Sequence, residues 1–438
     1  MTAVLIDGRR TPFFKAGTLA GVDAVEIGTT PIKALLKRYD GIEKHIDWVV
    51  GSNLGNGVLP PGGSNMARII ATLSGVPKDI PAVTVNINCA SGLHAAIYAA
   101  RLIELGEANL VLVPSVEVMS DYTAVFGRQQ RALYEKMLAA SRIKNPVKQM
   151  AGVLGAQMKI WMRGHRPLLK KNFGYEPIWM LMTGLSDPIS GMGMDKIADL
   201  IAIEFGVSRE EQDLFAYESH RKAEAAQRVK KFADEIVPFR GISDDNGVRH
   251  NQELSKLASL RPLNRGGTVT AGNASQVSDG ACALLIASEE FAAAHGLPVL
   301  AEFSSGKSST KGCEPSLMGI GPVFAIHDLL KKTGLSLNDI DLLESNEAFA
   351  SVVLAQDKIL SSQTLCDRLG ISHPIGNTVT DKLNVNGGGI AMGHPVAVSG
   401  SRLVLTTALE LRRRNSELGI VTLCIGGGQG EALLVERR

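Results

Sequence analysis

The feature that most constrains this chain is an α/β pattern that occurs twice, once in its first third and once in its last third. Short segments rich in β-branched residues alternate with amphipathic helical stretches, which is typical of α/β folds. In the first third we expect strands at residues 3–8, 47–53, 82–88 and 110–115, and helices at 26–40 and 92–108.

The second copy of the pattern aligns with the first at one constant spacing. The matching residues are Leu35, Leu36, Lys37, Ile46 and Asp47 in the first copy, and Leu329, Leu330, Lys331, Ile340 and Asp341 in the second. Further along, Ser91-Gly92 and Ser399-Gly400 each open a predicted helix that leads to a strand. Two matches in the same order favour two similar α/β halves with a pseudo-twofold relation.

Between the halves, at about residues 120–267, the rhythm of strands and helices is lost, which predicts an inserted, loop-rich region. From Tyr122 to Tyr175 there are eleven Lys or Arg residues and a single acid, Glu135, interleaved with apolar residues such as Leu154 and Trp161. The segment is either a solvated basic face that meets phosphate groups or a partner subunit, or a basic amphipathic element on an anionic membrane surface.

The bulk properties exclude several classes of protein. A length of 438 residues implies two or three domains, and a net charge near +2 gives no general attraction to nucleic acid. The five cysteines form neither a CxxC pair nor a metal-binding spacing with histidine. We therefore expect no metal, no disulfide scaffold and a reducing compartment. The N-terminal segment has no signal-peptide pattern and no stretch is apolar enough to cross a bilayer, so we expect a cytoplasmic location.

Cys89 is the first candidate for chemistry, because it stands at the junction of a buried-type strand and a helix. A thiol there points into the crevice at the carboxyl end of the strand, and the helix N-terminus favours a thiolate. The small residues Ala90, Ser91 and Gly92 leave room for a substrate. The alternative is that Cys89 is a buried small hydrophobe, as many cysteines are.

His394 occupies the corresponding turn in the second half, between a run of glycines and a helix. If the halves are related by a pseudo-twofold axis, the Cys89 and His394 turns open on one crevice. A histidine beside a cysteine is the base that nucleophilic catalysis needs, although a lone histidine in a loop is usually just solvated.

Two further strand ends carry polar groups. Cys424 ends an apolar strand before three glycines, where it is either a second proton donor and acceptor or a buried residue of a tight hairpin. Asn346 and Glu347 follow a third strand end, where the Asn346 amide could hold a water or a carbonyl oxygen, or cap a helix. The chain has no phosphate loop of the GxxxxGK[ST] type, no early GxGxxG and no HExxH.

Four segments, taken in this order, resemble the signature blocks of the thiolase family: NINCASGLHAA, NEAFASVV, NGGGIAMGHPVAVSGSRL and CIGGGQG. The segment GGTVTAGNASQVSDGACALLI resembles the part of the family that returns from the loop domain to the first core. The resemblance covers essentially the whole chain. It implies two core domains of the αβαβα type with an inserted loop domain, and a homodimer or tetramer. The N-terminal core would comprise residues 1–119 and 268–287, the loop domain 120–267 and the C-terminal core 288–438.

The same resemblance implies a role for each matching residue. Cys89 would be the nucleophile that takes the acyl group, His394 its base, and Cys424 the acid/base for the acetyl carbon. Asn346 would position a water that forms one oxyanion hole with His394, while backbone N–H groups of Cys89 and Gly426 would form the other.

Contacts to coenzyme A are implied as well, with CoA as co-substrate and no permanently bound cofactor. Ser275, Ala348 and Phe349 fall where the family lines the pantetheine tunnel, and Arg249 lies near where a basic residue meets CoA. Met192 stands in a Gly-Met-Gly element where short-chain members carry His-Met-Gly, so their CoA-contacting histidine is missing.

The resemblance therefore predicts thiolytic cleavage of 3-oxoacyl-CoA to acetyl-CoA and a shortened acyl-CoA, in fatty-acid β-oxidation. The basic insertion, the segment SREEQDLFAYESH and the phrase DNGVR resemble the β subunit of the trifunctional β-oxidation complex, which implies a hydratase/dehydrogenase partner. A peripheral membrane contact through 122–175 stays one of the two interpretations of the charge pattern. Those subunits usually carry histidine where this chain has Asn346. The alternatives are a biosynthetic acetoacetyl-CoA thiolase, a related condensing enzyme, and a non-catalytic lipid carrier or scaffold. Condensing enzymes lack a second catalytic cysteine, so Cys424 argues against that alternative. A carrier or scaffold would need none of the residues Cys89, Asn346, His394 and Cys424, so the presence of all four argues against it.

Overall fold

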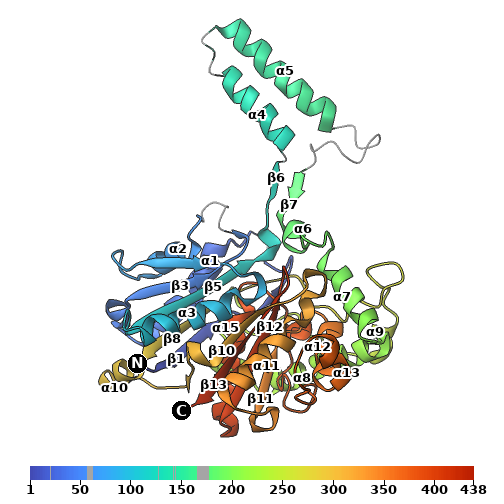
Figure 1. The fold of residues 1–438 in the computed structure, drawn as a ribbon. Coiled ribbons are helices and arrows are strands. Elements are labelled where there is room, and N and C mark those ends of the chain that lie inside the picture. Colours follow the sequence, from blue (N-terminus) through green and yellow to red (C-terminus); the bar gives the residue numbers. More distant parts are fainter. Residues whose placement is uncertain (20, 57–62, 127, 142, 144, 165–176) are drawn as a thin grey trace. The chain divides into compact units, whose positions relative to one another are not determined.

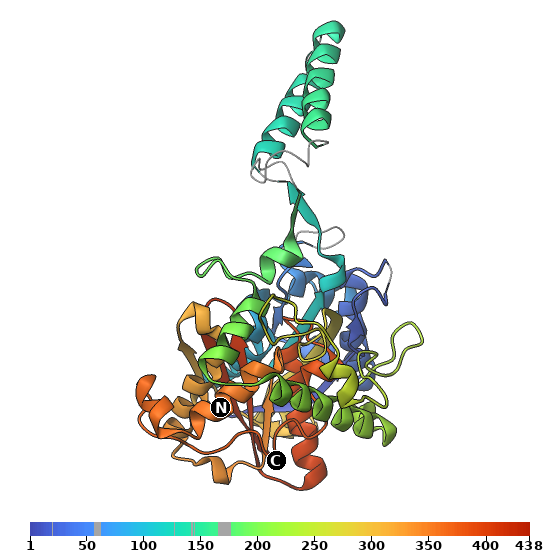
Figure 2. The same ribbon diagram turned by 90° about the vertical axis from the view of Figure 1, so that its right-hand side faces the viewer.

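The computed structural model describes residues 1–19, 21–56, 63–126, 128–141, 143, 145–164 and 177–438. They form two compact units, a larger one of Met1–Asp121 with Ser186–Arg438 and a smaller one of Tyr122–Leu185 (Figure 1). Figure 2 shows the ribbon from a second direction. The smaller unit falls inside the predicted insertion, whereas residues 186–267 belong to the larger unit. The domain boundaries given above stay a prediction.

In the larger unit, the described residues form one mixed sheet of eleven strands. Their order is β11-β12-β13-β9-β1-β8-β5-β3-β4, with β10 paired to β13 and β2 paired to β8. The strands are β1 Ala3–Arg10, β2 Phe14–Lys15, β3 Trp48–Ser52, β4 Ala82–Val85, β5 Leu110–Val118, β8 Ser278–Ser288, β9 Ala301–Glu302, β10 Ser308–Gly312, β11 Leu342–Ser345, β12 Leu418–Ile425 and β13 Gln429–Arg437.

The pairing directions confirm the predicted duplication. In the first half, β3 runs parallel to β5, β5 antiparallel to β8, and β8 antiparallel to β1. In the second half, β11 runs parallel to β12, β12 antiparallel to β13, and β13 antiparallel to β10. The same succession of directions is thus built twice from different parts of the chain.

The aspartates of the sequence repeat show this duplication at atomic detail. Asp47 Oδ2 accepts hydrogen bonds from the backbone N–H groups of Asn109 and Leu110, at 2.7 and 3.1 Å. Asp341 Oδ2 accepts from the N–H groups of Glu417 and Leu418, at 2.8 and 3.0 Å. Each aspartate therefore anchors the start of the next parallel strand, β5 or β12, in the same way.

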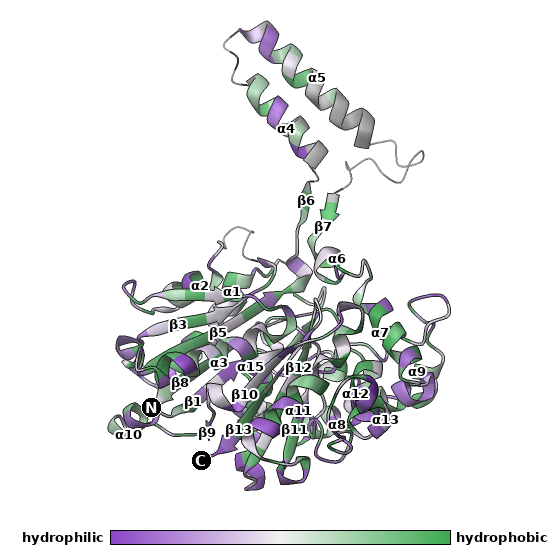
Figure 3. Cartoon of the chain, viewed as in Figure 1, coloured by the Kyte–Doolittle hydropathy of each residue, from purple (hydrophilic) through white to green (hydrophobic). Residues whose placement is uncertain are grey.

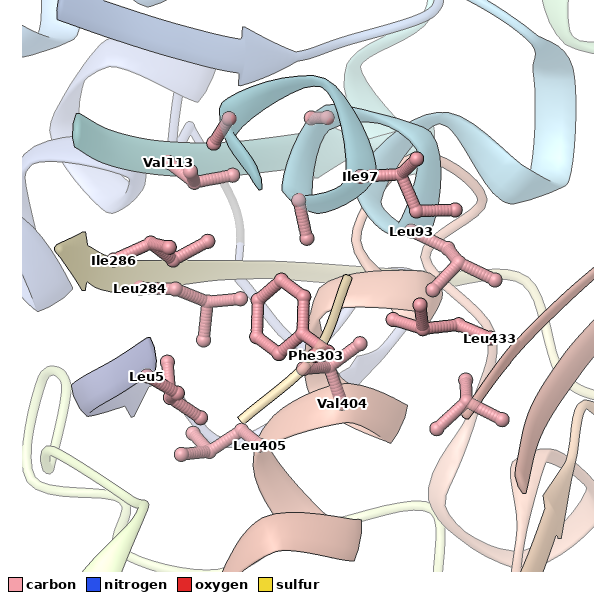
Figure 4. Close-up of a cluster of buried hydrophobic side chains, with 14 of the residues drawn as sticks. Leu5, Leu93, Ile97, Val113, Leu284, Ile286, Phe303, Val404, Leu405 and Leu433 are labelled. Carbon is pink, nitrogen blue, oxygen red and sulfur yellow. The ribbon is translucent and has the colours of Figure 1, made fainter. Parts of the chain in front are cut away.

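Helices cover the sheet, and apolar residues from both halves share one cluster. The helices of the larger unit are α1 Ala24–Arg38, α2 Met66–Ser74, α3 Ser91–Glu104, α7 Met194–Glu204, α8 Arg209–Arg228, α9 Leu254–Ala258, α10 Glu289–Ala294, α11 Gly321–Thr333, α12 Ala350–Leu360, α13 Gln363–Arg368, α14 Gly389–Met392 and α15 Ser399–Arg414. Figure 4 shows this cluster, where Leu93 and Ile97 of α3 lie with Val404 and Leu405 of α15 around Phe303. Burial of so many apolar side chains is the main force that holds the two halves together.

The N-terminal ends of α3 and α15 touch through the two glycines of the repeat. A Cβ atom on Gly400 would lie 2.3 Å from the backbone nitrogen of Leu93, and one on Gly92 would lie 2.6 Å from Ser401 Oγ. Ser401 Oγ also donates to Gly92 O at 3.2 Å. Only glycine permits so close an approach. The contact brings together the two turns that precede these helices, which carry Cys89 and His394.

The smaller unit consists of a short two-stranded antiparallel sheet and three helices in its described part. These are β6 Ala124–Phe126, β7 Pro177–Trp179, α4 Arg128–Ser141, α5 Pro146–Gly164 and α6 Met180–Gly184. Hydrophilic and hydrophobic positions are mixed along α4 and α5 (Figure 3). No described helix combines the length and the apolar character needed to cross a membrane.

Candidate active site

Cys89 lies in a tight turn between β4 and α3. The strand ends at Val85, and residues Asn88–Ala90 form one 3₁₀ turn before α3 begins at Ser91. Asn88 adopts the left-handed region at φ 51°, and its Nδ2 donates to Gly426 O at 2.8 Å. Ser91 Oγ accepts from the N–H of Ile87 at 2.9 Å and donates to Asn88 O at 2.7 Å. The turn is therefore fixed from within and from the neighbouring β12–β13 hairpin.

Cys89 is half-buried, and two N–H groups lie beside its sulfur. Burial raises the pKa of the Cys89 thiol to about 11, while backbone hydrogen bonds from Gly426 and from Cys89 itself lower it. The thiol is thus protonated at neutral pH and needs a base in order to react. The two N–H groups at the sulfur are the pair predicted to form an oxyanion hole, and such donors stabilise negative charge that develops beside them.

Cys424 brings a second thiol to the same place. It is the last residue but one of β12, is buried, and pairs with Gly430 across the hairpin. Burial raises the pKa of its thiol, and the neighbouring Cys89 raises that pKa further. The structure therefore brings together two candidate cysteines from different halves of the chain.

His394 follows α14 and the left-handed Gly393, which has φ 108°. Its imidazole is buried, with Nδ1 2.5 Å from Ser399 Oγ and Nε2 3.3 Å from Asn346 Nδ2. The Nδ2 group of Asn346 can donate only, so this contact places the imidazole proton on Nδ1 and leaves Nε2 as an acceptor. Burial lowers the pKa of His394 to about 4, with a smaller contribution from the Arg402 cation. The ring is neutral at physiological pH, which is the state that a general base requires.

Asn346 directly follows β11, and its backbone N–H donates to Thr422 O on β12 at 3.0 Å. The residue is 1% exposed, and its amide nitrogen is directed at His394. The other end of the amide, Oδ1, has no hydrogen-bond partner among the described residues. A buried acceptor of this kind is costly in a permanent core and is common where a ligand binds.

The predicted CoA contacts occupy three different places. Ser275 donates its backbone N–H to Ala348 O at 2.9 Å, and Phe349 pairs with the residue before Ser275, so these three residues form one strip. Arg249 is exposed, and its N–H donates to the imidazole of His220 on α8 at 3.1 Å. Met192 is half-buried and packs against the apolar cluster around α7 and α12. Their contacts with CoA stay predictions.

Sequence reasoning missed several residues that shape the site. The sequence marks Ser399 only as the start of a helix. A hydroxyl five residues after a candidate base could nevertheless have indicated a hydrogen-bond partner for the imidazole. Asn88 was given no role, and its left-handed turn has no sequence signature beyond asparagine itself. Glu347 was noted without a function, because its partners come from segments far away in the chain.

Two family models match the chain almost from end to end. Residues 3–290 match the thiolase N-terminal domain, and residues 297–437 match the thiolase C-terminal domain.

Similar curated proteins carry three kinds of name. The chain is 37% identical to an acetyl-CoA acetyltransferase of Chromobacterium violaceum, over all of both chains. It is 37% identical to a 3-ketoacyl-CoA thiolase of Bacillus subtilis, over 99% of each chain. It is 36% identical to a β-ketoadipyl-CoA thiolase of Pseudomonas aeruginosa, over 99% of this chain and 98% of that protein.

A solved structure agrees with these matches. Human mitochondrial 3-ketoacyl-CoA thiolase in complex with CoA superposes with a TM-score of 0.80 at 32% identity, over 100% of this chain and 98% of that one. The predicted fold and the predicted acyltransferase activity are thereby confirmed. The chain belongs to the thiolase family.

Proposed function

We propose that this acyltransferase cleaves 3-oxoacyl-CoA with CoA, giving acetyl-CoA and an acyl-CoA shortened by two carbons, through an acyl group held on Cys89. The observation that carries the proposal is the meeting of two thiols, the buried Cys424 and the half-buried Cys89, which faces the N–H of Gly426. The buried pair of His394 and Asn346 supports it, because it offers a neutral base beside an amide donor.

The first half-reaction needs a base, an anion site and an acid. His394 Nε2 takes the proton of the Cys89 thiol as the sulfur attacks the 3-keto carbon, and the N–H groups of Cys89 and Gly426 stabilise the resulting oxyanion. The bond between the second and third carbons then breaks. The enolate of acetyl-CoA is stabilised by protonated His394 and by a water that the Asn346 amide positions, and Cys424 gives its proton to the acetyl carbon.

The second half-reaction returns every group to its first state. The thiol of an incoming CoA attacks the acyl group on Cys89 and passes its proton to the Cys424 thiolate. The Cys89 sulfur leaves and takes back the proton held by His394. One hard step is thus divided into two easier ones, and the kinetics should be ping-pong.

Two cysteine variants test this assignment. Cys89→Ser should abolish CoA-dependent thiolysis while circular dichroism shows an intact fold. Cys424→Ala should abolish hydrogen exchange at the acetyl carbon, yet Cys89 should still become acylated, as measured by intact mass. The matched control is Cys366→Ala, a buried cysteine on α13 whose sulfur contacts Ile359 O. Normal turnover in Cys89→Ser, or normal exchange in Cys424→Ala, would contradict the mechanism.

We further propose that the enzyme is a broad-range or long-chain 3-ketoacyl-CoA thiolase of fatty-acid β-oxidation, because the chain lacks the His-Met-Gly element of short-chain members. The names of its relatives also favour a second candidate, an acetoacetyl-CoA thiolase. Thiolysis of 3-oxoacyl-CoAs from four to sixteen carbons separates the two. Highest kcat/KM at four carbons would favour the second candidate.

We propose four features of its surroundings: an oligomeric state, a partner, a location and a membrane contact. The enzyme is a homodimer or tetramer with a hydratase/dehydrogenase partner, and it works in the cytoplasm, where its five free cysteines stay reduced. It also contacts an anionic membrane through residues 122–175, of which 127, 142, 144 and 165–175 lie outside the described residues. In the described part, Leu138, Met150 and Met158 are more than half exposed.

A further inference from the structure

Glu347 carries a fully buried carboxylate directly after Asn346, with only 1% of the residue exposed. Three donors from separate segments converge on it. Ser219 Oγ on α8 donates to Oε2 at 2.6 Å, Asn384 Nδ2 donates to Oε1 at 2.7 Å, and the N–H of Ile390 in α14 donates to Oε2 at 3.2 Å. An ionised carboxylate only accepts hydrogen bonds, so it suits three donors at once. The contacts join the turn after β11 to α8, to the loop before α14 and to α14 itself.

The glycine run before His394 is shaped around this carboxylate. A Cβ atom on Gly388 would lie 2.2 Å from Glu347 Cδ, and one on Gly389 would lie 3.3 Å from Asn346 Oδ1. The N–H of Gly388 donates to Ser219 Oγ at 3.2 Å, which closes a ring of contacts around Glu347. Helix α14 begins at Gly389, and His394 follows its end. The carboxylate therefore lies between the backbone that carries Asn346 and the backbone that carries His394.

We propose that Glu347 is a positioning residue, which holds the Asn346 amide against His394 Nε2 by fastening the turn after β11 to the loop at 384–390. This rests on the thiolase mechanism proposed above. The Asn346 amide lies 3.3 Å from His394 Nε2, and small displacements of such a group weaken its contact with a developing charge.

The two half-reactions should depend on Glu347 to different extents. Asn346 acts on the enolate oxygen of the acetyl unit through the water that it positions, and this enolate exists only when the carbon–carbon bond is broken or formed. Transfer of an acyl group between Cys89 and CoA uses instead the N–H groups of Cys89 and Gly426. A loosened Asn346 therefore slows the carbon–carbon step and spares acyl transfer.

Glu347→Gln is the variant that tests this, because it keeps the size of the side chain but replaces one acceptor oxygen with a donor. The new NH₂ group then faces either the side-chain NH₂ of Asn384 or the backbone N–H of Ile390, so that two donors oppose each other. The Ser219 hydroxyl, in contrast, can rotate and accept a hydrogen bond. Truncation is avoided, because Glu347 lines a cavity of about 410 Å³ that a shorter side chain would enlarge. We expect kcat for 3-oxoacyl-CoA cleavage to fall about 10- to 100-fold, with KM changed less than about threefold.

Acyl transfer is measured separately, as exchange of labelled CoA into acetyl-CoA, and we expect it to change less than about threefold in Glu347→Gln. The matched control is Asp357→Asn on α12, whose carboxylate likewise accepts backbone N–H groups, including that of Val379 at 2.8 Å. This control should leave both assays unchanged. In the double variant with Asn346→Ala, the loss of cleavage should be no larger than in Asn346→Ala alone, because Glu347 acts through Asn346.

The outcomes separate the two proposals. If the unaltered protein fails to cleave any 3-oxoacyl-CoA, the proposed function is wrong. If it cleaves them but Glu347→Gln slows both assays equally, or neither, the role of Glu347 is wrong. Should Glu347→Gln not fold, Ser219→Ala removes one donor to the same carboxylate, and its cleavage must still fall more than its acyl transfer for the inference to stand.

Discussion

Burial shifts the pKa values of Cys89 and His394 in opposite directions, because it disfavours the charged form of each. The pKa of the Cys89 thiol is raised to about 11, and that of the His394 imidazole is lowered to about 4. At neutral pH both groups are therefore uncharged. The thiolate forms only as the sulfur attacks a substrate. The oxyanion that forms on the substrate then accepts the hydrogen bonds of the Cys89 and Gly426 N–H groups.

The pH dependence of Cys89 alkylation in the free enzyme follows from this shift. A thiol with a raised pKa gains thiolate about tenfold per pH unit up to that pKa, whereas an ordinary cysteine levels off above about pH 9. We expect the rate of carbamidomethylation by iodoacetamide, followed on the Cys89 peptide by mass spectrometry, to keep rising between about pH 7 and pH 10. A free cysteine-containing peptide is the control. A rate for Cys89 that is already constant at about pH 8 would contradict the raised pKa.

At the scale of elements, the decisive contact is the one between the first turns of α3 and α15. Gly400 lies against Leu93, with 2.3 Å between its virtual Cβ and the Leu93 nitrogen. A backbone atom cannot move aside as the end of a side chain can. The two helices must therefore separate if Gly400 acquires a side chain, and the turns that carry Cys89 and His394 separate with them.

Gly400→Ala should consequently reduce both stability and activity. Overpacking in a close-packed core costs about 1–3 kcal/mol, which urea denaturation would show as a lower midpoint. We expect thiolysis to fall by more than the unfolded fraction explains. The control is Gly155→Ala in α5, where a Cβ atom would meet nothing within 4 Å. An alanine at 400 that left both the midpoint and turnover unchanged would show that the helices tolerate separation.

Much of this arrangement can be predicted from the sequence, because its signals are local. The alternation of strands and helices predicted the two halves, and the repeated Asp47 and Asp341 do make equivalent contacts. Strand ends were less accurate: β4 ends at Val85, not at residue 88, because Asn88 turns into the left-handed region. The contacts of Glu347 could not be predicted, because they join residues 128 and 37 positions apart, and no pattern in one sequence encodes such a pairing.

At the scale of the whole molecule, charge is distributed unequally between the two units. The chain has 46 Lys and Arg residues and 44 acids, but residues 122–185 contain eleven of the former and only two of the latter, Glu135 and Glu176. The larger unit is therefore net acidic, and it has no general attraction to an anionic surface. Any such attraction must come from the smaller unit.

The smaller unit should therefore determine binding to anionic vesicles. Exposed apolar residues on α4 and α5, among them Leu138, Met150 and Met158, would enter the interface, while the cations contribute about 1 kcal/mol each near the surface. We expect the intact protein to float with phosphatidylserine vesicles at low salt and to be released at high salt. Replacing the exposed Lys136 and Lys148 with glutamate should weaken this binding at least about tenfold.

The matched control replaces Lys33 and Lys44, two exposed lysines of the larger unit, with glutamate. Both double variants change the net charge of the molecule equally, so only the location of the charge differs between them. If net charge alone governed binding, the two variants would lose affinity to the same extent. A specific contact through the smaller unit requires that only the Lys136 and Lys148 variant stays unbound. If the unaltered protein fails to float at low salt, residues 122–175 do not bind a membrane, and their cations must serve CoA phosphates or a partner subunit instead.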